Sequence, residues 1–261
     1  MTDEIKLSIV IVSWNVKKLL KNCLQSIEKF KGSLSLEIIV VDNASHDQTV
    51  EMLKQEFPQV ILIPNSKNLG FAAANNQGIL RSRGQFILLL NPDTEIVKNK
   101  LERIIKFIEN KTKAGVVSCK HLNPDWTLQP SVRRFPNFLS IFLIGTKIAK
   151  LLPNMPPIYK YLARDFDYKT AQPIDQVAGS FFLIRREVID QIGLLDEDFF
   201  IWFEEVDYCR RARNRGWEIW YTPDFEIIHY GGQSFNQVGT LRKQKLFFKS
   251  AAHYLAKHGL K

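Results

Sequence analysis

The chain has 261 residues, of which 45% are hydrophobic and 24% charged. These values exclude a disulfide-stapled miniprotein, a coiled coil and a disordered tail, and the length suffices for the core of one domain. The 36 Lys+Arg outnumber the 27 Asp+Glu and give a formal net charge of +9. This excess favours polyanions, phosphates or an acidic surface as partners, rather than cations.

The cysteines and the N-terminus indicate the compartment. Cys23, Cys119 and Cys209 form no CxxC pair, which predicts reduced thiols packed in or near the core. The opening residues, MTDEIKLSIVIVSWN, lack the basic region and the cleavage site of a signal peptide. No stretch reaches the roughly 20 uninterrupted apolar residues that a membrane helix needs. We therefore expect a cytoplasmic protein.

Strands and helices alternate through the first half of the chain. Residues 7–12 form an unbroken β-branched run, typical of a strand buried on both faces, and 17–30 have the apolar face of an amphipathic helix. The same rhythm predicts strands at 36–41, 59–63, 85–90 and 115–119, and helices at about 47–56, 71–82 and 98–110. Such alternation predicts an α/β fold: a mostly parallel, Rossmann-like twisted sheet with helices on both faces.

The rhythm breaks past Lys120. Three prolines lie in 121–137, and 133–173 contains an apolar-basic excursion from the sheet. Regular structure is expected again at 176–184, as a helix at about 204–215, as short strands near 217–221 and 225–229, and as a C-terminal helix at about 238–257. We expect one domain, 1–261, with a nucleotide-binding half at 1–95 and a second half at 96–261 that share one sheet.

Polar residues follow each of the first four predicted strands. In an open parallel sheet, ligands bind at the carboxyl ends of the strands, so these residues should converge on one edge. They are Ser13-Trp14-Asn15 after the first strand, Asp42-Asn43-Ala44-Ser45-His46-Asp47 after the second, Asn65 to Gly70 after the third and Asn91-Pro92-Asp93-Thr94-Glu95 after the fourth.

Two of these segments fit a nucleotide. Asp42 lies where an acid accepts hydrogen bonds from a ribose hydroxyl or a base, although Asp-Asn-x-Ser is equally suited to a turn or an N-cap. Residues 68–78 enter a helix through small side chains, either so that backbone N–H groups approach a diphosphate or for tight helix-to-sheet packing. Neither GxGxxG nor GxxxxGK[ST] occurs there, so a dehydrogenase and a P-loop are not supported.

A second group of residues fits a metal ion. Asp93 follows an apolar strand on a proline-stiffened turn, where one carboxylate can hold Mg²⁺ or Mn²⁺ against a diphosphate; a plain turn is the alternative. His229 ends an apolar strand, where a histidine is usually structural. With a metal-binding carboxylate predicted at the same edge, we favour a neutral imidazole ligand.

Acidic residues open the helix predicted at 204–215. Glu204, Glu205 and Asp207 complement the helix dipole, and Asp207 can pair with Arg211 one turn later. Helix capping alone does not explain why two adjacent carboxylates follow the aromatic run FFIWF. Such a wall would remove water from a carboxylate and raise its pKa.

Seven segments, in order across nearly the whole chain, resemble a family 2 glycosyltransferase of the GT-A fold, closest to the rhamnosyltransferase-like subgroup. They are VSWN, VVDNASHD, NLGFAAANNQG, LLLNPDTE, VAGSFFLIRRE, FIWFEEVDYCRRARNRGW and HYGGQS. The resemblance implies inverting transfer of a sugar, with rhamnose favoured, from a dTDP- or UDP-sugar, with Mn²⁺ or Mg²⁺ as cofactor. It implies a glycan or lipid-linked saccharide as acceptor, in cell-surface polysaccharide synthesis.

The same resemblance implies roles for single residues. Asn91-Pro92-Asp93 matches the metal motif DxD with its first acid replaced, which removes one negative charge, and His229 completes the metal site. Glu205 matches the catalytic base, where relatives usually have the shorter Asp, with Glu204 and Asp207 as alternatives. The expected nucleotide contacts are Ser13, Asn15, Asp42, Asn43, Asn68, Gly70, Phe71, Asn75, Asn91 and Asp93, and the expected acceptor contacts are Gly179, Ser180 and Trp202.

Other interpretations remain. A sugar nucleotidyltransferase needs a glycine-rich basic signature after the first strand, which VSWNVKK does not supply. A non-catalytic module binding sugar nucleotide or a membrane surface is a third hypothesis; the scattered lysines oppose nucleic acid. The excursion at 133–173 is expected to be a lid or an amphipathic segment on the inner face of the membrane, and the acid-free tail 237–261 fits that surface or a solvated helix.

Overall fold

The computed structural model describes residues 4–259 and contains one ten-stranded sheet. Its main path runs β3-β2-β1-β4-β11-β6-β12-β5, with β7 paired to β6 and β9 paired to β12. The strands are β1 (Leu7–Ser13), β2 (Leu36–Asp42), β3 (Ile61–Pro64), β4 (Phe86–Leu90), β5 (Thr94–Lys98), β6 (Ala114–Leu122), β7 (Leu128–Gln129), β9 (Gln172–Ile174), β11 (Phe181–Arg185) and β12 (Glu218–His229). A separate two-stranded ladder pairs β8 (Val132–Arg133) with β10 (Gln176–Val177).

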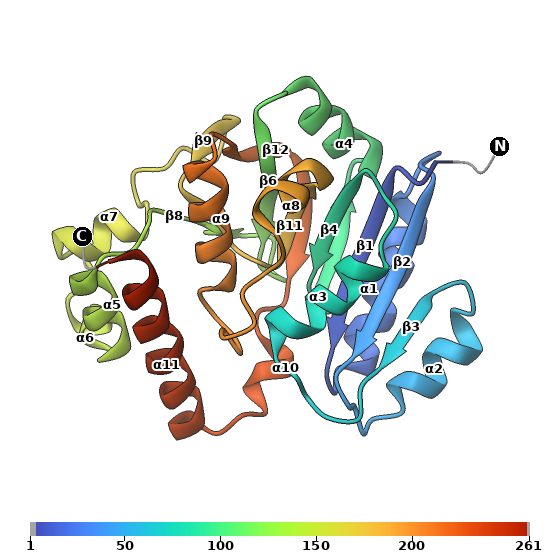
Figure 1. Cartoon of the computed structure of the whole chain (residues 1–261), viewed down its shortest axis with the longest axis horizontal. Coiled ribbons are helices and arrows are strands. Elements are labelled where there is room, and N and C mark those ends of the chain that lie inside the picture. Colours follow the sequence, from blue (N-terminus) through green and yellow to red (C-terminus); the bar gives the residue numbers. More distant parts are fainter. Residues whose placement is uncertain (1–3, 260–261) are drawn as a thin grey trace.

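Helices cover both faces of the sheet (Figure 1). They are α1 (Lys17–Phe30), α2 (Thr49–Glu56), α3 (Phe71–Arg81), α4 (Leu101–Asn110), α5 (Phe138–Gly145), α6 (Ile148–Leu151), α7 (Pro156–Tyr161), α8 (Arg186–Ile192), α9 (Glu204–Asn214), α10 (Gln233–Asn236) and α11 (Thr240–His258). The α/β architecture inferred from the alternating pattern is confirmed. No helix within residues 4–259 combines the length and apolar character needed to cross a membrane.

The side chains of β1 divide between two buried cores. Ile9 and Ile11 pack in one core with Leu24 of α1, whereas Val10 packs in the other with Ile79 of α3. Successive side chains of a strand point to opposite faces, so both faces of β1 are covered by helices. Because both faces of β1 are buried, residues 9–12 form an unbroken apolar run.

The second half of the sheet is mixed rather than parallel. β11 lies antiparallel between β4 and β6, and β5 lies antiparallel to β12 at the edge. Two sequence-based expectations were wrong here. The segment after Asp93 forms β5, so α4 begins at Leu101 instead of 98, and the two short strands expected near the end are one bulged strand, β12. The short helix α8 was not predicted.

The excursion after β8 folds into three short helices. Asn137 caps α5: its side chain accepts a hydrogen bond from the Ser140 backbone N–H (2.9 Å), and the Ser140 hydroxyl accepts one from the Asn137 N–H (3.0 Å). Ile141 of α5 joins a buried cluster with Tyr254 of α11. The excursion is thus packed against the C-terminal helix (Figure 1).

Candidate active site

A cavity of about 410 Å³ lies at the carboxyl edge of β1 and β4. It gathers twelve residues that the sequence suggested for nucleotide, metal, acceptor or base. They are Asn43, Asn68, Gly70, Phe71, Asn91, Asp93, Gly179, Ser180, Trp202, Glu204, Glu205 and His229. Residues far apart in the chain thus share one cavity.

Antiparallel pairing brings the second half of the chain to this edge. Because β11 runs against β4, its start lies beside the end of β4, and the Asn91 backbone N–H donates to the Ser180 carbonyl at 3.0 Å. β5 and β12 pair with Thr94 opposite His229, and the Tyr230 N–H donates to the Asp93 carbonyl at 2.9 Å. The first pairing places Ser180 beside Asn91, and the second places His229 beside Asp93.

One side of the cavity is a network of amides. The Asn43 side chain donates to the Gly70 carbonyl (3.0 Å) and accepts from the side chain of Asn65 (3.0 Å), while the Gly70 N–H donates to the Asn68 side chain (2.9 Å). Gly70 has φ +90°, and a Cβ there would lie 2.5 Å from the Phe200 carbonyl oxygen. Glycine is therefore required where the loop before α9 crosses the start of α3.

Ser13 and Asp42 lie opposite each other at the ends of β1 and β2, and both are buried without lining the larger cavity. Asp42 uses one carboxylate oxygen to accept the Ser45 N–H at 2.9 Å, so the turn function considered from the sequence is present. Its second oxygen, Oδ1, and the Ser13 hydroxyl are buried without a hydrogen-bond partner in residues 4–259. A buried unpaired polar atom is unfavourable, and a ligand hydroxyl or N–H would relieve it.

Like Ser13 and Asp42, three further suggested residues do not line the larger cavity. Asn15 accepts a hydrogen bond from the His46 N–H at 2.7 Å and so joins two strand-end loops. Asn75 donates to the Phe71 carbonyl one turn earlier in α3. Asp207 is fully buried and paired with Arg211, whereas Glu204 and Glu205 line the larger cavity.

Asp93 and His229 form the metal-like pair. His229 Nε2 lies 3.5 Å from Asp93 Oδ1 and has no hydrogen-bond partner in the described chain, while Gln129 Oε1 holds Nδ1 at 2.7 Å. Burial alone would raise the pKa of Asp93, but the neighbouring His229 imidazole and the Gln233 backbone N–H, which donates to Asp93 Oδ2 at 3.1 Å, outweigh it, so the pKa is lowered. An ionised carboxylate beside an open imidazole nitrogen is a donor set that fits Mn²⁺ or Mg²⁺.

Glu204 and Glu205 enter the cavity from the first turn of α9. The two residues before them, Trp202 (φ +64°) and Phe203 (φ +72°), both adopt the left-handed backbone region, which is strained for large side chains. Burial raises the pKa of Glu205 to about 7, and burial together with the charge of Glu205 raises the pKa of Glu204 well above its usual value. One oxygen of each carboxyl group is buried and unpaired in residues 4–259.

A second cavity, of about 350 Å³, lies on the other side of Glu205. Glu205, Trp202 and Ala178 line both cavities, so the carboxylate stands at their junction. The second cavity is also lined by Arg133 and by Tyr161 of α7. The geometry provides separate spaces for two molecules on either side of one carboxylate.

Two residues of the site were missed from the sequence. Arg242 of α11 is the single Lys or Arg among the described residues that line the larger cavity. Nothing distinguishes it locally from its basic neighbours in the tail. His121 lies behind Ser180, with Nε2 2.8 Å from the hydroxyl, and burial followed by the charge of His229 lowers its pKa to about 3. The predicted strand ended at 119, which left His121 outside it.

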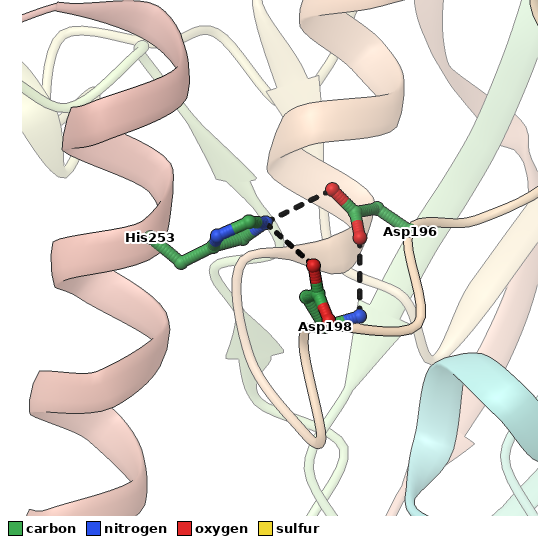
Figure 2. A group of neighbouring side chains, drawn as sticks. All are labelled: Asp196, Asp198 and His253. Carbon is green, nitrogen blue, oxygen red and sulfur yellow. Dashed lines mark hydrogen bonds and ion pairs between the residues drawn. The ribbon is translucent and has the colours of Figure 1, made fainter.

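A third group with metal-binding side chains lies outside the larger cavity. Figure 2 shows His253 of α11 pointing at Asp196 (3.0 Å) and Asp198 (4.0 Å), both from the loop before α9. The Lys257 ammonium also contacts Asp196 at 2.6 Å. Burial alone would raise the pKa of Asp196, but Lys257 and His253 outweigh it and lower the pKa to about 2. A cation already compensates this carboxylate, and the contacts join α11 to the loop.

The doubly wound sheet and the acid-lined cavity at its carboxyl edge define an α/β protein of the GT-A fold. The model of glycosyl transferase family 2 matches residues 8–193, so the chain belongs to this family and is a glycosyltransferase.

Named relatives and a solved structure agree with this assignment. The chain is 26% identical to N-acetylglucosaminyl-diphospho-decaprenol L-rhamnosyltransferase of Mycobacterium tuberculosis over 225 residues, which cover 80% of this chain and 73% of the relative. It is 28% identical to rhamnosyltransferase WbbL of Escherichia coli over 264 residues, covering 95% and 92%. The crystal structure of GalNAc-T7 with UDP, GalNAc and Mn²⁺ superposes with a TM-score of 0.61 at 17% identity, covering 88% of this chain and 44% of the other, and this likeness concerns the fold.

Proposed function

We propose that this glycosyltransferase moves a sugar from a nucleoside diphosphate sugar to an acceptor hydroxyl, with inversion at the anomeric carbon. The observation that carries the proposal is Glu205, which lies at the junction of two cavities with one unpaired oxygen and a pKa raised to about 7. A carboxylate of this pKa is matched to accept a proton near neutral pH.

Inversion requires one in-line displacement. Glu205 takes the proton of the acceptor hydroxyl while the acceptor oxygen bonds to the anomeric carbon. The bond from that carbon to the diphosphate breaks, and the nucleoside diphosphate leaves with the electron pair. Burial and the charge of Glu205 raise the pKa of Glu204, which favours its protonated form, and this form would donate a hydrogen bond beside the base.

The donor is held by groups on the opposite wall. Asp93 and His229 are suited to hold Mn²⁺ or Mg²⁺, which when bound supplies positive charge to the leaving diphosphate. Arg242 donates to the diphosphate from α11. The amide network around Asn43 and the free oxygen of Asp42 bind the nucleotide of a dTDP- or UDP-sugar.

The relatives favour rhamnose as the sugar and a lipid-linked saccharide as the acceptor, in cell-surface polysaccharide synthesis. Both relatives described above are named rhamnosyltransferases, and the name of the Mycobacterium tuberculosis relative includes a diphospho-decaprenol substrate. Cys23, Cys119 and Cys209 are free and buried, which fits a reducing cytoplasm.

Donor binding tests the proposal directly. The protein is incubated with dTDP-rhamnose and a panel of UDP-sugars, with and without Mn²⁺ or Mg²⁺, and its melting temperature and the release of nucleoside diphosphate are followed. We expect one donor to stabilise the protein in the presence of metal and to be turned over slowly. Absence of stabilisation by every nucleotide would refute the proposal.

A further inference from the structure

The net positive charge of the chain is concentrated in two stretches that contain no acidic residue. Residues 126–164 and 227–261 hold twelve of the 36 Lys+Arg and none of the 27 Asp+Glu. The remainder therefore has 24 basic and 27 acidic residues and is slightly negative. Helices from the two stretches, α5, α6, α7 and α11, lie together at the end of the molecule away from β3 (Figure 1).

The same stretches carry most of the exposed large apolar side chains. Eleven such side chains are exposed in residues 4–259, and eight belong to 138–159 or to α11. Leu151 is 81% exposed and Leu241 is 84% exposed. The eight are Phe138, Leu139, Phe142, Leu151, Leu152, Tyr159, Leu241 and Phe248. A concentration of this kind marks an interaction surface.

Exposed lysines lie among these apolar residues, and no acid in either stretch is present to pair with them. In α11, Leu241, Lys245 and Phe248 follow helical spacing and share one side of the helix. The lysines are Lys147, Lys150, Lys160, Lys245 and Lys249. We call these five lysines and the eight apolar residues the apolar-basic face.

The helices that carry the apolar-basic face pack closely against each other. A Cβ at Gly145 would lie 2.7 Å from Phe248 and 2.9 Å from Phe247, so α5 and α11 pack backbone to side chain at close range. Ile141 and Tyr254 fill the buried cluster between these helices. The inward sides of both helices are already used, and each of the eight apolar side chains still remains at least 44% exposed.

Charge and shape together select one occupant. A second copy would oppose one basic surface to another, which is repulsive. A nucleic acid would meet the lysines, but it offers no apolar environment to leucines that are more than four-fifths exposed. An anionic bilayer satisfies both groups, since lysines reach the headgroups while Leu and Phe enter the acyl boundary.

We propose that the apolar-basic face docks on an anionic lipid bilayer. Docking also brings the second cavity to the membrane, because Tyr161 of α7 and Phe247 of α11 line that cavity together with Glu205. The consequence for the acceptor rests on the proposed function. The acceptor is a saccharide on a membrane-anchored lipid, and it reaches Glu205 from the bilayer side. The excursion at 133–173 is then a membrane contact rather than a lid.

Co-sedimentation of the full chain with lipid vesicles tests the docking. We expect binding to vesicles of phosphatidylcholine mixed with phosphatidylglycerol, declining as salt is raised, and little binding to phosphatidylcholine alone. Lys147→Glu/Lys150→Glu should weaken binding by about tenfold or more. The matched control Lys54→Glu/Lys106→Glu makes the same charge change at exposed positions of α2 and α4 and should bind like the wild type.

An apolar variant, Phe142→Ser/Leu151→Ser, should also bind less while circular dichroism shows an unchanged fold. Equal binding to neutral and anionic vesicles, or equal loss in both charge-reversal variants, would overturn the proposal. So would a dimer in solution that the Lys147→Glu/Lys150→Glu variant abolishes, since a second copy would then cover the face. The assay contains no sugar nucleotide, so its outcome is independent of the transfer reaction.

Discussion

Two clusters of acids and histidines in this molecule differ in how their atoms are paired. In the larger cavity, Glu204, Glu205 and His229 each keep one buried atom without a partner among residues 4–259. In the cluster beside α11, Asp196 contacts Lys257, and Asp207 contacts the same lysine at 2.9 Å.

The first cluster has buried polar atoms that are free to contact a ligand, whereas the second has its charges paired within the protein. Arg211 and His258 complete the pairing of Asp207, at 2.8 and 2.7 Å, so this buried charge is compensated within the protein. The unpaired atoms around Glu205 carry an energetic cost that substrate contacts would remove. The residue types alone would suggest a metal site in both clusters. The ion pairs and hydrogen bonds of their side chains distinguish the two.

The strongest test of the contrast is Glu205→Gln. Removing the proposed base should lower the transfer rate by about 10² to 10⁴-fold, because the acceptor proton then has no positioned carboxylate to receive it. Donor affinity, measured by thermal shift, should stay near the wild-type value. Asp198→Asn, in the other cluster, is the control and should keep full activity. Equal loss of donor binding in Glu205→Gln would make this residue a binding or structural group.

Asp207→Asn should act on stability instead. Breaking a buried ion pair costs about 3 kcal/mol, because the partner cations lose their counter-charge. We expect a lower melting temperature and a lower midpoint of urea unfolding. Turnover per folded molecule should be retained at low temperature. A folded Asp207→Asn enzyme without activity would contradict the structural assignment.

Asp93→Asn tests the metal assignment. Loss of the carboxylate charge should weaken the metal-dependent part of donor binding by about tenfold or more. Donor binding without metal should change little. Asp196→Asn is the matched variant in the other cluster, and Mn²⁺ titration should give the same curve as for the wild type. The assignment fails if Asp196→Asn, and not Asp93→Asn, removes the metal response.

The last expected effect is on the pH dependence of stability. The pKa of Glu205 is about 7 in the folded protein against a usual 4.5, so between these values the folded chain binds a proton that the unfolded chain has released. The contribution of this proton to stability is complete below pH 4.5 and is lost as pH rises through 7. Glu205→Gln has no such proton.

The melting temperature of Glu205→Gln relative to the wild type should therefore increase from pH 4.5 to about 7 and stay constant above that. Differential scanning calorimetry across this range measures the difference. Parallel curves for the two proteins would show that the carboxyl group is not desolvated.

The side of the site formed by the first strands was accessible from the sequence because its signals are local. Asp42 ends an apolar strand, Asp93 follows another within three residues, and parallel strands end at a common edge. The other side depends on pairing between distant segments. β5 has only five residues and its partner β12 lies in the last quarter of the chain, so no local pattern marked it as a strand. Arg242 was missed because it enters the cavity through the packing of α11.

The pairing of β5 with β12 bears on how the enzyme is made. β5 ends the strand order and its sheet partner is β12, so Asp93 and His229 meet only when about half of the chain has followed the acid. Long-range pairing of this kind forms late in folding. A nascent or truncated chain that ends before His229 lacks half of the metal pair. Under the proposed function, completion of synthesis is thus a condition for the metal-dependent part of donor binding.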